Sequence, residues 1–457
     1  MRALAMTDPG NQLHHAPVVV VGLGVTGLSV ARHLAAQGTS VMVVDSREHP
    51  PGLDALRREL PALPVRLGAF DASLLAGAAR VILSPGVALA EPAVQGALHA
   101  GVEVLGDVEL FAREVPAPVA AVTGSNGKST VTALLGDLAR AGGLRTRVGG
   151  NLGPPALDLL AGEPADLYVL ELSSFQLETT WSLAPAVAAV LNVSADHMDR
   201  YPDLAAYVAA KARILAGAEV AVLNLDDPVV ARLGHEAGRV VGFSVQGDPR
   251  ARARVIPGAD GDWLALGGDA VVAAASLPLA GKHNIANVLA AMAMAEVLGI
   301  APEAMARGIA AFRGLAHRCM RIARHAGVSW IDDSKGTNVG ATVAAIEGIA
   351  QGRNLVLIAG GVGKGQDFHA LAAPIARHVH TLVLMGRDAP AIDEVVPAGV
   401  TRRHAASMPE AVALAARTAR AGDSVLLSPA CASFDMFDGY AARGDAFAAA
   451  VRALEQT

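Results

Sequence analysis

The chain has 457 residues, 52% of them hydrophobic and only 4% aromatic, and its formal net charge is −6 at pH 7. This length exceeds what one hydrophobic core holds and predicts roughly two to four domains, while the acidic balance gives no reason to expect nucleic-acid binding. No apolar run reaches the ~20 residues of a membrane helix, residues 1–10 lack the apolar core of a signal peptide, and two cysteines are too few for a disulfide framework or a zinc site. We therefore expect a cytoplasmic protein without a membrane partner.

The first predicted strand, residues 17–21, leads into a glycine-rich turn. The turn, Gly22-Leu-Gly-Val-Thr-Gly27, matches G-x-G-x-x-G, a helix follows through Gln37, and a second strand at 41–44 ends in Asp45. A βαβ unit with an acid about 20 residues after the turn is typical of dinucleotide binding. The same turn accepts any ligand with a diphosphate, and no later segment supplies hydride-transfer chemistry, so the ligand stays open between NAD and another diphosphate.

Two further strands, at 80–86 and 102–105, and a helix that ends near Glu114 complete this predicted domain. Pro116-Ala-Pro118 then stiffens a short linker. We therefore place the first domain at residues 1–115 and the second from residue 116 onward.

A phosphate-binding loop opens the second domain. The apolar run Val119–Val122 predicts a buried strand, Thr123–Gly127 is a turn of small residues, and Lys128 begins a helix. Backbone N–H groups in such a turn and the helix N-terminus face an anion, but the helix dipole is worth only about 0.3–1 kcal/mol. A lysine charge and the hydroxyl of Ser129, which suits Mg²⁺, complete the pattern. The loop is a variant, because Val122 stands where the usual pattern has its first glycine.

Lysine is rare in this chain, and its positions are informative. The sequence has five lysines against 32 arginines, so a lysine that remains is expected where a compact ammonium or a reactive amine is needed. The five are Lys128, Lys211, Lys282, Lys335 and Lys364.

Polar residues follow the next strands of the second domain. Glu171 lies near the end of a strand at 168–172, and Asp196-His197 follows a strand at 186–191. These residues suit a metal or a phosphate site, although an edge-strand carboxylate and a helix cap are the plainer interpretations. Lys211 lies on an amphipathic helix, where it is either a surface cation or an amine that must be neutral or modified to lie near a metal.

The helix that begins after Gly281 carries Asn284 and Asn287 on one face, where they suit either a nucleobase or an ordinary helix start. We place the second boundary near residue 314, which gives domains at 116–314 and 315–457. The last domain alternates strands and helices, so loops that contain Lys335 and Lys364 should gather at one sheet edge. Gly360–Gly365 resembles a second phosphate loop, but no Ser or Thr follows its lysine, which favours a carboxylate or phosphate clamp.

The motifs together resemble the Mur ligases, which are ATP-dependent enzymes that add amino acids to peptidoglycan precursors. The segments that carry the resemblance, in chain order, are Gly124–Thr130, Glu171, Asp196–Tyr201, Lys211, Gly281–Asn284 and His317-Arg318. Three further segments are similar to the branch that adds D-glutamate: Asp333–Thr342, Gly360–Gly365 and Ser428–Ser433. The resemblance covers all three domains. It implies an α/β fold with an N-terminal Rossmann-like domain, a central P-loop-type mononucleotide-binding sheet and a C-terminal doubly wound Rossmann-like sheet.

The resemblance also implies a ligand for each set of residues. A UDP-sugar, not NAD, would contact Gly24, Val25, Thr26, Asp45, Ser46, Arg47, Ser84, Gly86, Asn151 and Ser173. ATP would contact Gly124, Ser125, Asn126, Gly127, Lys128, Ser129, Thr130, Asn284, Asn287, Arg318, Asp333 and Lys335. D-Glutamate would contact Thr337, Lys364, Ser433 and Tyr440, the last standing where the family has a phenylalanine. Two Mg²⁺ ions would be bound by Ser129, Glu171, His197 and Lys211, with Lys211 carbamylated, and catalysis would rest on Lys128, Glu171, His197 and Lys211.

The reaction that the resemblance implies joins D-glutamate to UDP-N-acetylmuramoyl-L-alanine. ATP phosphorylates the L-alanyl carboxylate, and the amine of D-glutamate displaces phosphate from the acyl phosphate. We expect a monomer that binds these small molecules. The alternatives are a sibling ligase for another amino acid, a folylpolyglutamate-type ligase that shares the central loop, and an NAD-binding regulator or dehydrogenase.

Overall fold

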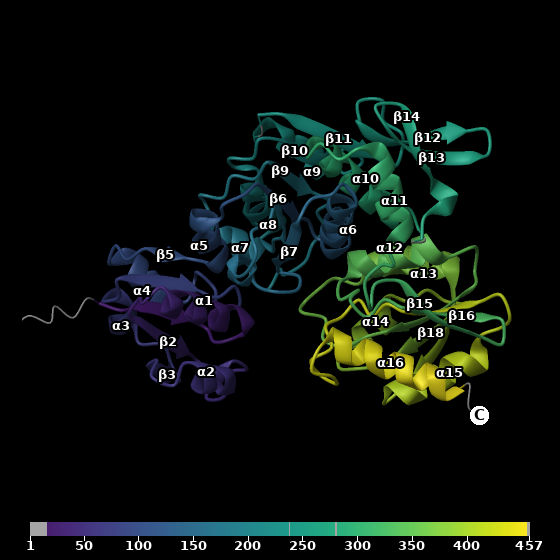
Figure 1. The fold of residues 1–457 in the computed structure, drawn as a ribbon. Helices are drawn as coiled ribbons and strands as arrows, with labels where there is room; N and C mark the ends of the chain where they lie inside the picture. The colour runs from purple at the N-terminus through teal and green to yellow at the C-terminus, as the bar shows by residue number, and fades with distance from the viewer. Residues whose placement is uncertain (1–15, 237, 279–280, 455–457) are drawn as a thin grey trace, which may run out of the picture. The chain divides into compact units, whose positions relative to one another are not determined.

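The computed structural model describes residues 16–236, 238–278 and 281–454. They fold into two compact units that the chain enters more than once (Figure 1). The first unit ends at Pro116 and also contains Gly153–Glu163 and Phe175–Leu183. The second unit contains Ala117–Leu152, Pro164–Ser174 and the chain from Ala184 onward.

The first unit is built on a five-stranded parallel sheet with the order β3-β2-β1-β4-β5. Its strands are β1 (Val18–Val21), β2 (Val41–Asp45), β3 (Val65–Leu67), β4 (Arg80–Leu83) and β5 (Val104–Leu105). Its helices include α1 (Val25–Ala36), α2 (Leu53–Glu59), α3 (Ala72–Ala76), α4 (Pro92–His99) and α5 (Asp107–Glu114). The central strand is four valines, which suits a strand covered on both faces. The strand order reverses between β1 and β4, and ligands of doubly wound sheets bind at such a point.

Two segments from later in the chain pack onto this unit. The segment that contains the 3-10 helix Ala156–Leu160 joins α1, because Ser29 Oγ donates a 2.6 Å hydrogen bond to Asp158 Oδ1. In the second segment, the backbone N–H groups of Trp181 and Ser182 donate to the fully buried Glu109 on α5, at 2.8 and 2.9 Å. A buried carboxylate with several donors is stable where an unpaired one would not be, so Glu109 fixes this return of the chain.

A nine-stranded sheet forms the first part of the second unit. Its order is β14-β13-β12-β11-β10-β9-β6-β8-β7, parallel from β7 to β12 and antiparallel beyond it. The strands are β6 (Val119–Thr123), β7 (Thr146–Gly150), β8 (Leu167–Glu171), β9 (Val187–Val190), β10 (Ala221–Asn224), β11 (Val240–Ser244), β12 (Ala253–Gly258), β13 (Gly261–Leu266) and β14 (Asp269–Ala273). The helices are α6 (Lys128–Ala141), the end of α7 (Ser174–Glu178) that belongs to this unit, α8 (Leu204–Ala212), α9 (Pro228–Arg232), α10 (Lys282–Val297) and α11 (Pro302–Ala311). Apolar faces of α6, α10 and α11 bury one side of the sheet in a continuous core.

A six-stranded sheet forms the rest of the second unit. Its order is β15-β16-β20-β17-β18-β19, and only β15 is antiparallel to its neighbour. The strands are β15 (Met320–His325), β16 (Val328–Asp332), β17 (Leu355–Ala359), β18 (Val379–Leu384), β19 (Thr401–His404) and β20 (Ser424–Leu427). Helices α12 (Val339–Ile349), α13 (Ala372–His378) and α14 (Ala389–Val395) bury one face, and α15 (Met408–Thr418) and α16 (Tyr440–Leu454) bury the other (Figure 1). This is the doubly wound arrangement that the sequence predicts.

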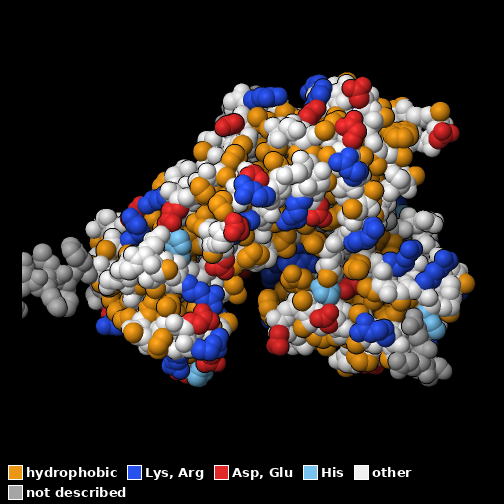
Figure 2. All heavy atoms as spheres, in the orientation of Figure 1, with side chains coloured by type: hydrophobic (Ala, Val, Ile, Leu, Met, Phe, Trp, Pro, Cys, Tyr) orange, Lys and Arg blue, Asp and Glu red, His pale blue; other side chains and the backbone are white. Residues whose placement is uncertain are grey.

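The charge distribution on the surface and the lengths of the helices are relevant to whether the protein binds nucleic acid or a membrane. On the face drawn in Figure 2, Lys and Arg side chains are interspersed with Asp and Glu rather than gathered into a field of one sign. Within the described residues, no helix is both long and apolar enough to cross a bilayer. The predicted absence of a signal peptide falls on residues outside the described part of the chain.

Candidate active site

The phosphate loop leaves β6, an interior strand of the nine-stranded sheet, and enters α6. Gly127 caps the helix with φ +83°, and a Cβ added there would lie 2.3 Å from Asn287 Oδ1. Only glycine fits this position without strain. The side chain of Asn192 anchors the loop, because its Oδ1 accepts from Asn126 N at 2.8 Å and its Nδ2 donates to Asn126 O at 3.0 Å.

Two lysines converge on one carbonyl of the loop. Lys128 Nζ donates to Gly124 O at 2.9 Å and to Ser125 O at 3.0 Å, and Lys211 Nζ donates to the same Gly124 O at 2.8 Å. The Lys211 ammonium also lies 4.5 Å from the centre of the Tyr207 ring. Burial lowers the pKa of both lysines, and for Lys211 the charge of Lys128 lowers it further, to well below its ordinary value. The charge of Lys128 therefore lies where an anion would bind, beside the Lys211 amine, whose neutral form burial favours.

A buried acid lies beside this loop. Ser129 Oγ on α6 donates to Glu171 Oε2 at the end of β8, Asn151 Nδ2 donates to Glu171 Oε1 at 2.6 Å, and Arg318 Nη2 donates to Ser129 Oγ. Ser129 and Glu171 are each 2% exposed. Mg²⁺ is typically bound by one or two carboxylates together with substrate phosphates and water, so a hydroxyl and a carboxylate in contact next to a phosphate loop fit one such ion.

The second predicted metal position has a different composition. His197 Nε2 lies 3.7 Å from the buried Asp196, which also accepts from Asn338 Nδ2 at 3.0 Å and faces Lys364 Nζ at 3.4 Å. Burial raises the pKa of Asp196, but the charges of Lys364 and His197 outweigh it and hold the pKa below its ordinary value. Within the described residues, no group of three or more His, Cys, Asp or Glu side chains has metal-binding geometry. Lys211 as an ammonium would repel a cation, so a second ion needs a modified amine.

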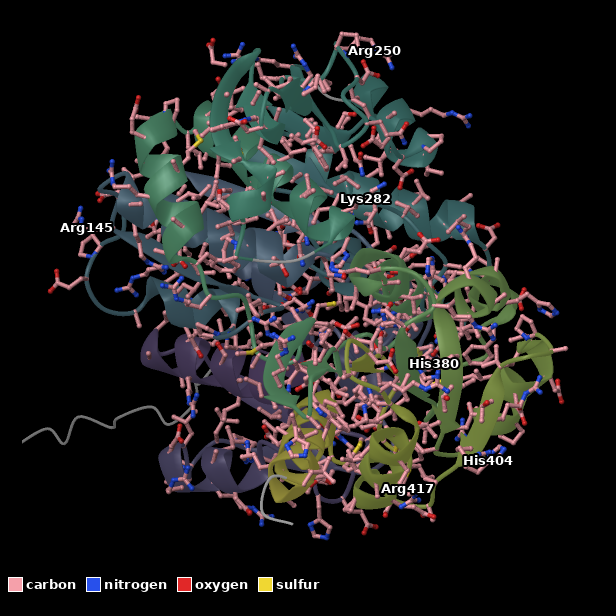
Figure 3. All side chains as sticks on the ribbon, turned by 90° about the vertical axis from the view of Figure 1, so that its right-hand side faces the viewer. Arg145, Arg250, Lys282, His380, His404 and Arg417 are labelled. Atoms are coloured by element: carbon pink, nitrogen blue, oxygen red, sulfur yellow. The ribbon has the colours of Figure 1, made fainter. Side chains whose placement is uncertain are left out.

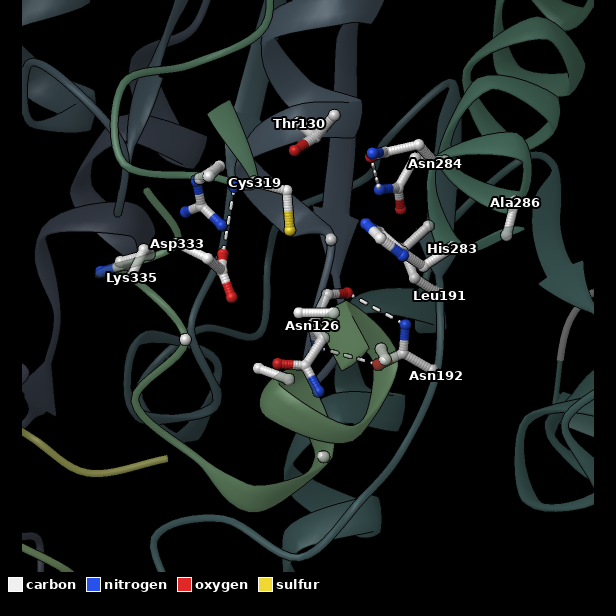
Figure 4. A pocket seen from close by; sticks show the side chains of 18 of the residues that line it. Asn126, Thr130, Leu191, Asn192, His283, Asn284, Ala286, Cys319, Asp333 and Lys335 are labelled. Atoms are coloured by element: carbon white, nitrogen blue, oxygen red, sulfur yellow. Dashed lines mark hydrogen bonds between the residues drawn. The ribbon is translucent and has the colours of Figure 1, made fainter. Parts of the chain in front are cut away.

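A pocket of about 330 Å³ lies next to the phosphate loop (Figure 4). Eight of the twelve residues predicted to contact ATP line it: Asn126, Gly127, Thr130, Asn284, Asn287, Arg318, Asp333 and Lys335. The other four, Gly124, Ser125, Lys128 and Ser129, belong to the phosphate loop and the start of α6. The pocket therefore joins the loop to polar side chains from α10 and from the loop after β16.

The pKa values of two residues that line the pocket, Asp333 and Lys335, are shifted strongly from their ordinary values. Burial raises the pKa of Asp333 to about 7, even though Ser428 Oγ donates to its Oδ2 at 2.7 Å. Burial also lowers the pKa of Lys335 to about 8, and the charge of Arg318 acts in the same direction. Perturbed groups in a pocket are typical of functional sites.

Several residues of the pocket and its surroundings escape sequence reasoning. The pocket wall also contains Leu191, Phe243, His283, Ala286 and Cys319, with Ala344 and Ala345 from α12. In Figure 4, Cys319 lies beside Asp333 and across the pocket from His283 and Asn284. Small and apolar residues from different strands carry no local motif, whereas His283 and Cys319 each lie next to a predicted residue. Asp196 contacts His197, Asn338 and Lys364. It belongs to the motif Asp196–Tyr201, which could have indicated its role.

The five lysines differ in burial and in position. Lys128, Lys211, Lys335 and Lys364 are buried or half-buried at the site, whereas Lys282 at the start of α10 is exposed (Figure 3). Four of the five lysines therefore lie where a compact ammonium has a specific partner, and Lys282 is a surface cation.

The residues predicted to contact the UDP-sugar in the first unit follow β1, β2 and β4, whose carboxyl ends share one edge. Ser84 Oγ donates to Gly22 O at 2.8 Å. Asp45 is 2% exposed and accepts from Leu23 N at 2.6 Å and from the half-exposed guanidinium of Arg47 at 2.7 Å. Burial raises the pKa of Asp45, but these donors outweigh it and lower the pKa below its ordinary value. Asp45 thus fixes the glycine turn and Arg47. Gly24, Ser46 and Gly86 lie on the same loops, and Val25 and Thr26 begin α1. Asn151 and Ser173 belong to the second unit.

The residues predicted to contact D-glutamate lie on neighbouring loops of the six-stranded sheet. Val362 and Ala432 exchange two backbone hydrogen bonds, of 2.8 and 2.9 Å, which bind the loop of Lys364 to the loop of Ser433. Thr337 follows Lys335 on the loop after β16. The centre of the Tyr440 ring lies 3.9 Å from Lys335 Nζ, so this side chain contacts a residue that lines the nucleotide pocket.

Comparison with protein-family models gives three consecutive matches. They are the Mur ligase MurD-like N-terminal domain at residues 16–106, the Mur ligase middle domain at 122–295 and the Mur ligase glutamate ligase domain at 317–431. These matches follow the order of the three sheets and confirm the resemblance that the motifs carry.

Curated relatives match over nearly the whole chain. UDP-N-acetylmuramoylalanine–D-glutamate ligase from Nitrosococcus oceani is 52% identical over 440 residues, which are 96% of this chain and 97% of the relative. The protein of the same name from Marinobacter nauticus is 50% identical over 437 residues, 95% of this chain and 98% of the relative.

Solved structures share the fold. UDP-N-acetylmuramate-alanine ligase MurC from Thermotoga maritima has a TM-score of 0.61 at 19% identity, covering 97% of this chain and all (100%) of that chain. A pseudomurein peptide ligase type C from Methanothermus fervidus has a TM-score of 0.59 at 21% identity, covering 90% of this chain and 96% of that chain. The predicted three-domain α/β architecture is confirmed.

Proposed function

The chain belongs to the Mur ligase family, and from that premise we propose that it is the ATP-dependent ligase that joins D-glutamate to UDP-N-acetylmuramoyl-L-alanine. The observation that carries the proposal is the junction of the phosphate loop with the pocket of about 330 Å³ that eight of the predicted ATP residues line. A triphosphate bound along this junction would have its γ-phosphoryl group next to Lys128, Ser129 and Glu171.

The reaction must first overcome the poor leaving group of a carboxylate. A carboxylate does not acylate an amine, because its oxygen would have to leave as oxide. Transfer of the γ-phosphoryl group to the L-alanyl carboxylate gives an acyl phosphate. The amine of D-glutamate then attacks the carbonyl carbon, the C–O bond to the phosphate breaks, and phosphate leaves with one oxygen of the original carboxylate.

Lys128 is positioned to hold the transferring group. Its ammonium donates to two loop carbonyls at 2.9 and 3.0 Å, and phosphate oxygens that enter the loop would replace these acceptors. A preorganised cation in a buried site stabilises developing negative charge more than a solvated one. Arg318, whose guanidinium donates to Ser129 Oγ, brings a second cation from the segment that precedes β15.

Ser129 and Glu171 are the residues that would hold a first Mg²⁺. When bound, the ion neutralises charge on the phosphates and orients the phosphoryl group. The amide of Asn151 on the other oxygen of Glu171 fixes the direction of the carboxylate at 2.6 Å. Burial of both ligands excludes water, which would otherwise hydrolyse an acyl phosphate.

Lys211 is the residue for which we propose carbamylation. Burial and the charge of Lys128 favour the neutral amine, and a neutral amine adds to the carbon of CO₂, forms an N–C bond and releases one proton. The resulting carbamate is an anion with oxygen ligands. It would complete a second ion site with His197 and remove the repulsion between Lys128 and Lys211.

The loops of Lys364 and Ser433 are the proposed binding site for D-glutamate. Lys364 Nζ lies 3.4 Å from Asp196 Oδ1, so a substrate carboxylate would replace one carboxylate by another at the same ammonium. We further propose that the protein acts as a monomer in the cytoplasm, where its nucleotide-linked substrate is made.

The test is release of phosphate from ATP in the presence of UDP-N-acetylmuramoyl-L-alanine and a panel of D- and L-amino acids. We expect release with D-glutamate, at least tenfold above any other amino acid, and none without the nucleotide sugar. Preferred release with another amino acid would assign a sibling activity. Tight binding of NADH without any phosphate release would contradict the proposal.

A further inference from the structure

The Lys335 ammonium rests on an aromatic ring. Its Nζ lies 3.9 Å from the centre of the Tyr440 ring, well inside the ~6 Å over which the face of an aromatic ring attracts a cation. Within the described residues, this ammonium makes no hydrogen bond or ion pair. The ring is therefore the group that fixes its position.

The residue that carries this ammonium also lines the nucleotide pocket, and other charges lie near the ammonium. Lys335 lines the pocket together with Arg318 and Asp333. The charged groups that act on it are Arg318, Lys128 and Lys364, which repel it, and Glu171, which attracts it. Three cations against one acid would displace a flexible lysine side chain toward solvent. An aromatic face that favours the cation opposes this displacement.

Hydrogen bonds connect the backbone of Tyr440 to the loop that contains Lys335. Ser334 Oγ donates to Tyr440 O at 2.8 Å, and the buried guanidinium of Arg443 donates to Ser334 Oγ at 3.0 Å and to Ser334 O at 2.8 Å. Arg443 also donates to Cys431 O at 3.1 Å. The first turn of α16 and the loop that contains Lys335 are thus one hydrogen-bonded unit, which keeps the two backbones that carry the ring and the ammonium together.

We propose that Tyr440 is a positioning residue for the nucleotide, acting through Lys335: the face of its ring holds the ammonium of this pocket residue in place beside the site. This inference rests on the proposed function in so far as the pocket takes ATP. It differs from the assignment of Tyr440 to the D-glutamate site. It also explains why tyrosine serves where relatives are expected to have phenylalanine, since both rings offer the same face to a cation.

The first experiment measures binding of a non-hydrolysable ATP analogue with Mg²⁺ by titration calorimetry. We expect Tyr440→Phe to bind within about twofold of the wild type and Tyr440→Leu to bind about 2- to 30-fold more weakly, the range that a cation–π contact supplies. Tyr440 is half-buried, so the leucine leaves no large cavity, and thermal melting checks that the variant is folded.

A double-mutant cycle separates positioning from a general structural role. If Tyr440 acts through Lys335, adding Tyr440→Leu to Lys335→Met should cause no further loss of analogue affinity. Additive losses would overturn the inference. So would a Tyr440→Leu enzyme that binds the analogue normally and shows only a raised KM for D-glutamate.

The contact itself is observable without any ligand. The chain has only five lysines, so lysine labelled with ¹³C at Cε gives few NMR signals, which Lys335→Arg assigns. We expect the Lys335 signal to be shifted upfield by the ring in the wild type and in Tyr440→Phe, and the shift to vanish in Tyr440→Leu. An unshifted wild-type signal would overturn the inference. If the wild type fails to bind the analogue while this shift is present, the proposed function fails and the contact stands.

Discussion

Replacing Asp333 with asparagine should stabilise the protein and weaken nucleotide binding at the same time. Asp333 is 7% exposed in the wall of the pocket, and burial raises the pKa of its carboxyl to about 7. In the unfolded chain an aspartate has a pKa of about 3.9. Above pH ~4 the unfolded state loses this proton while the folded state keeps it, so stability falls as pH rises through the interval from ~4 to ~7.

The magnitude follows from the size of that interval. A difference of about 3 pKa units, at 1.36 kcal/mol per unit, means that the ionised carboxyl destabilises the fold by about 4 kcal/mol above pH ~7. Asparagine removes this cost but weakens the hydrogen bond from Ser428 Oγ, at about 1 kcal/mol. We therefore expect a net gain of about 3 kcal/mol in the free energy of unfolding above pH ~7, and no gain near pH ~4.

Urea unfolding at about pH 4.5 and about pH 8 measures this difference. Asp107→Asn is the matched control, because Asp107 lies in the first unit, outside the proposed site. Its carboxyl is fully buried, and burial raises its pKa to about 6 although nearby backbone N–H groups and the Gln176 side chain act in the opposite direction. Its shift of about 2 units predicts a gain of about 3 kcal/mol at neutral pH. Calorimetry with a non-hydrolysable ATP analogue should show weaker binding for Asp333→Asn and unchanged binding for Asp107→Asn.

Two results would refute this reasoning. If Asp333→Asn gains the same stability at both pH values, the buried carboxyl does not titrate between them and the gain has another cause. If Asp333→Asn binds the analogue as tightly as the wild type, the carboxyl is not part of the nucleotide site.

Three further variants test the loops of the proposed active site. Gly127→Ala should lose at least tenfold in analogue affinity, since its Cβ would lie 2.3 Å from Asn287 Oδ1. If calorimetry shows wild-type affinity for this variant, the close approach of Gly127 to Asn287 is not needed for nucleotide binding. Lys364→Ala should raise the KM for D-glutamate more than the KM for ATP, and the opposite ranking in steady-state kinetics would move this lysine to the nucleotide. Lys211→Arg should abolish phosphate release, whereas Lys211→Ala should regain part of it with added small carboxylic acids; full activity of the arginine variant would show that no carbamate is needed.

Sequence reasoning was strongest where one motif contains all the interacting parts. The phosphate loop has its strand, glycines, lysine and serine within Val119–Thr130, and the structure has β6, the turn and α6 in these places. The glycine turn of the first unit and the strands at Leu355–Ala359 and Ser424–Leu427 are likewise predictable, because long apolar runs end in glycine or proline. In these segments local pattern and tertiary environment agree.

The antiparallel extension β12–β14 was not predicted, although its turns contain Asp260-Gly261 and Gly267-Gly268. Its strands are partly exposed, so their apolar residues form no continuous run. Short runs such as those of β10 and β11 do not distinguish strand from helix by periodicity. Most predicted strands end within two residues of the observed ones, but the strand predicted at 80–86 already ends at Leu83 and the one predicted at 102–105 begins only at Val104.

Contacts between segments that are distant along the chain could not be predicted from the sequence. Arg318 reaches Ser129 across 189 residues, and Asn338 reaches Asp196 across 142. No pattern along the chain encodes such distances, which the packing of the two sheets within the second unit determines. The apolar wall of the pocket was missed for the same reason, because its members come from four separate elements.

The most direct test of the account follows an oxygen atom. UDP-N-acetylmuramoyl-L-alanine labelled with ¹⁸O in the L-alanyl carboxylate is incubated with the enzyme, ATP and D-glutamate, and the released phosphate is analysed by mass spectrometry. The account predicts one ¹⁸O atom in each phosphate released, and no release by Lys128→Ala. Unlabelled phosphate, formed together with the ligated product, would contradict phosphoryl transfer to the carboxylate at this site.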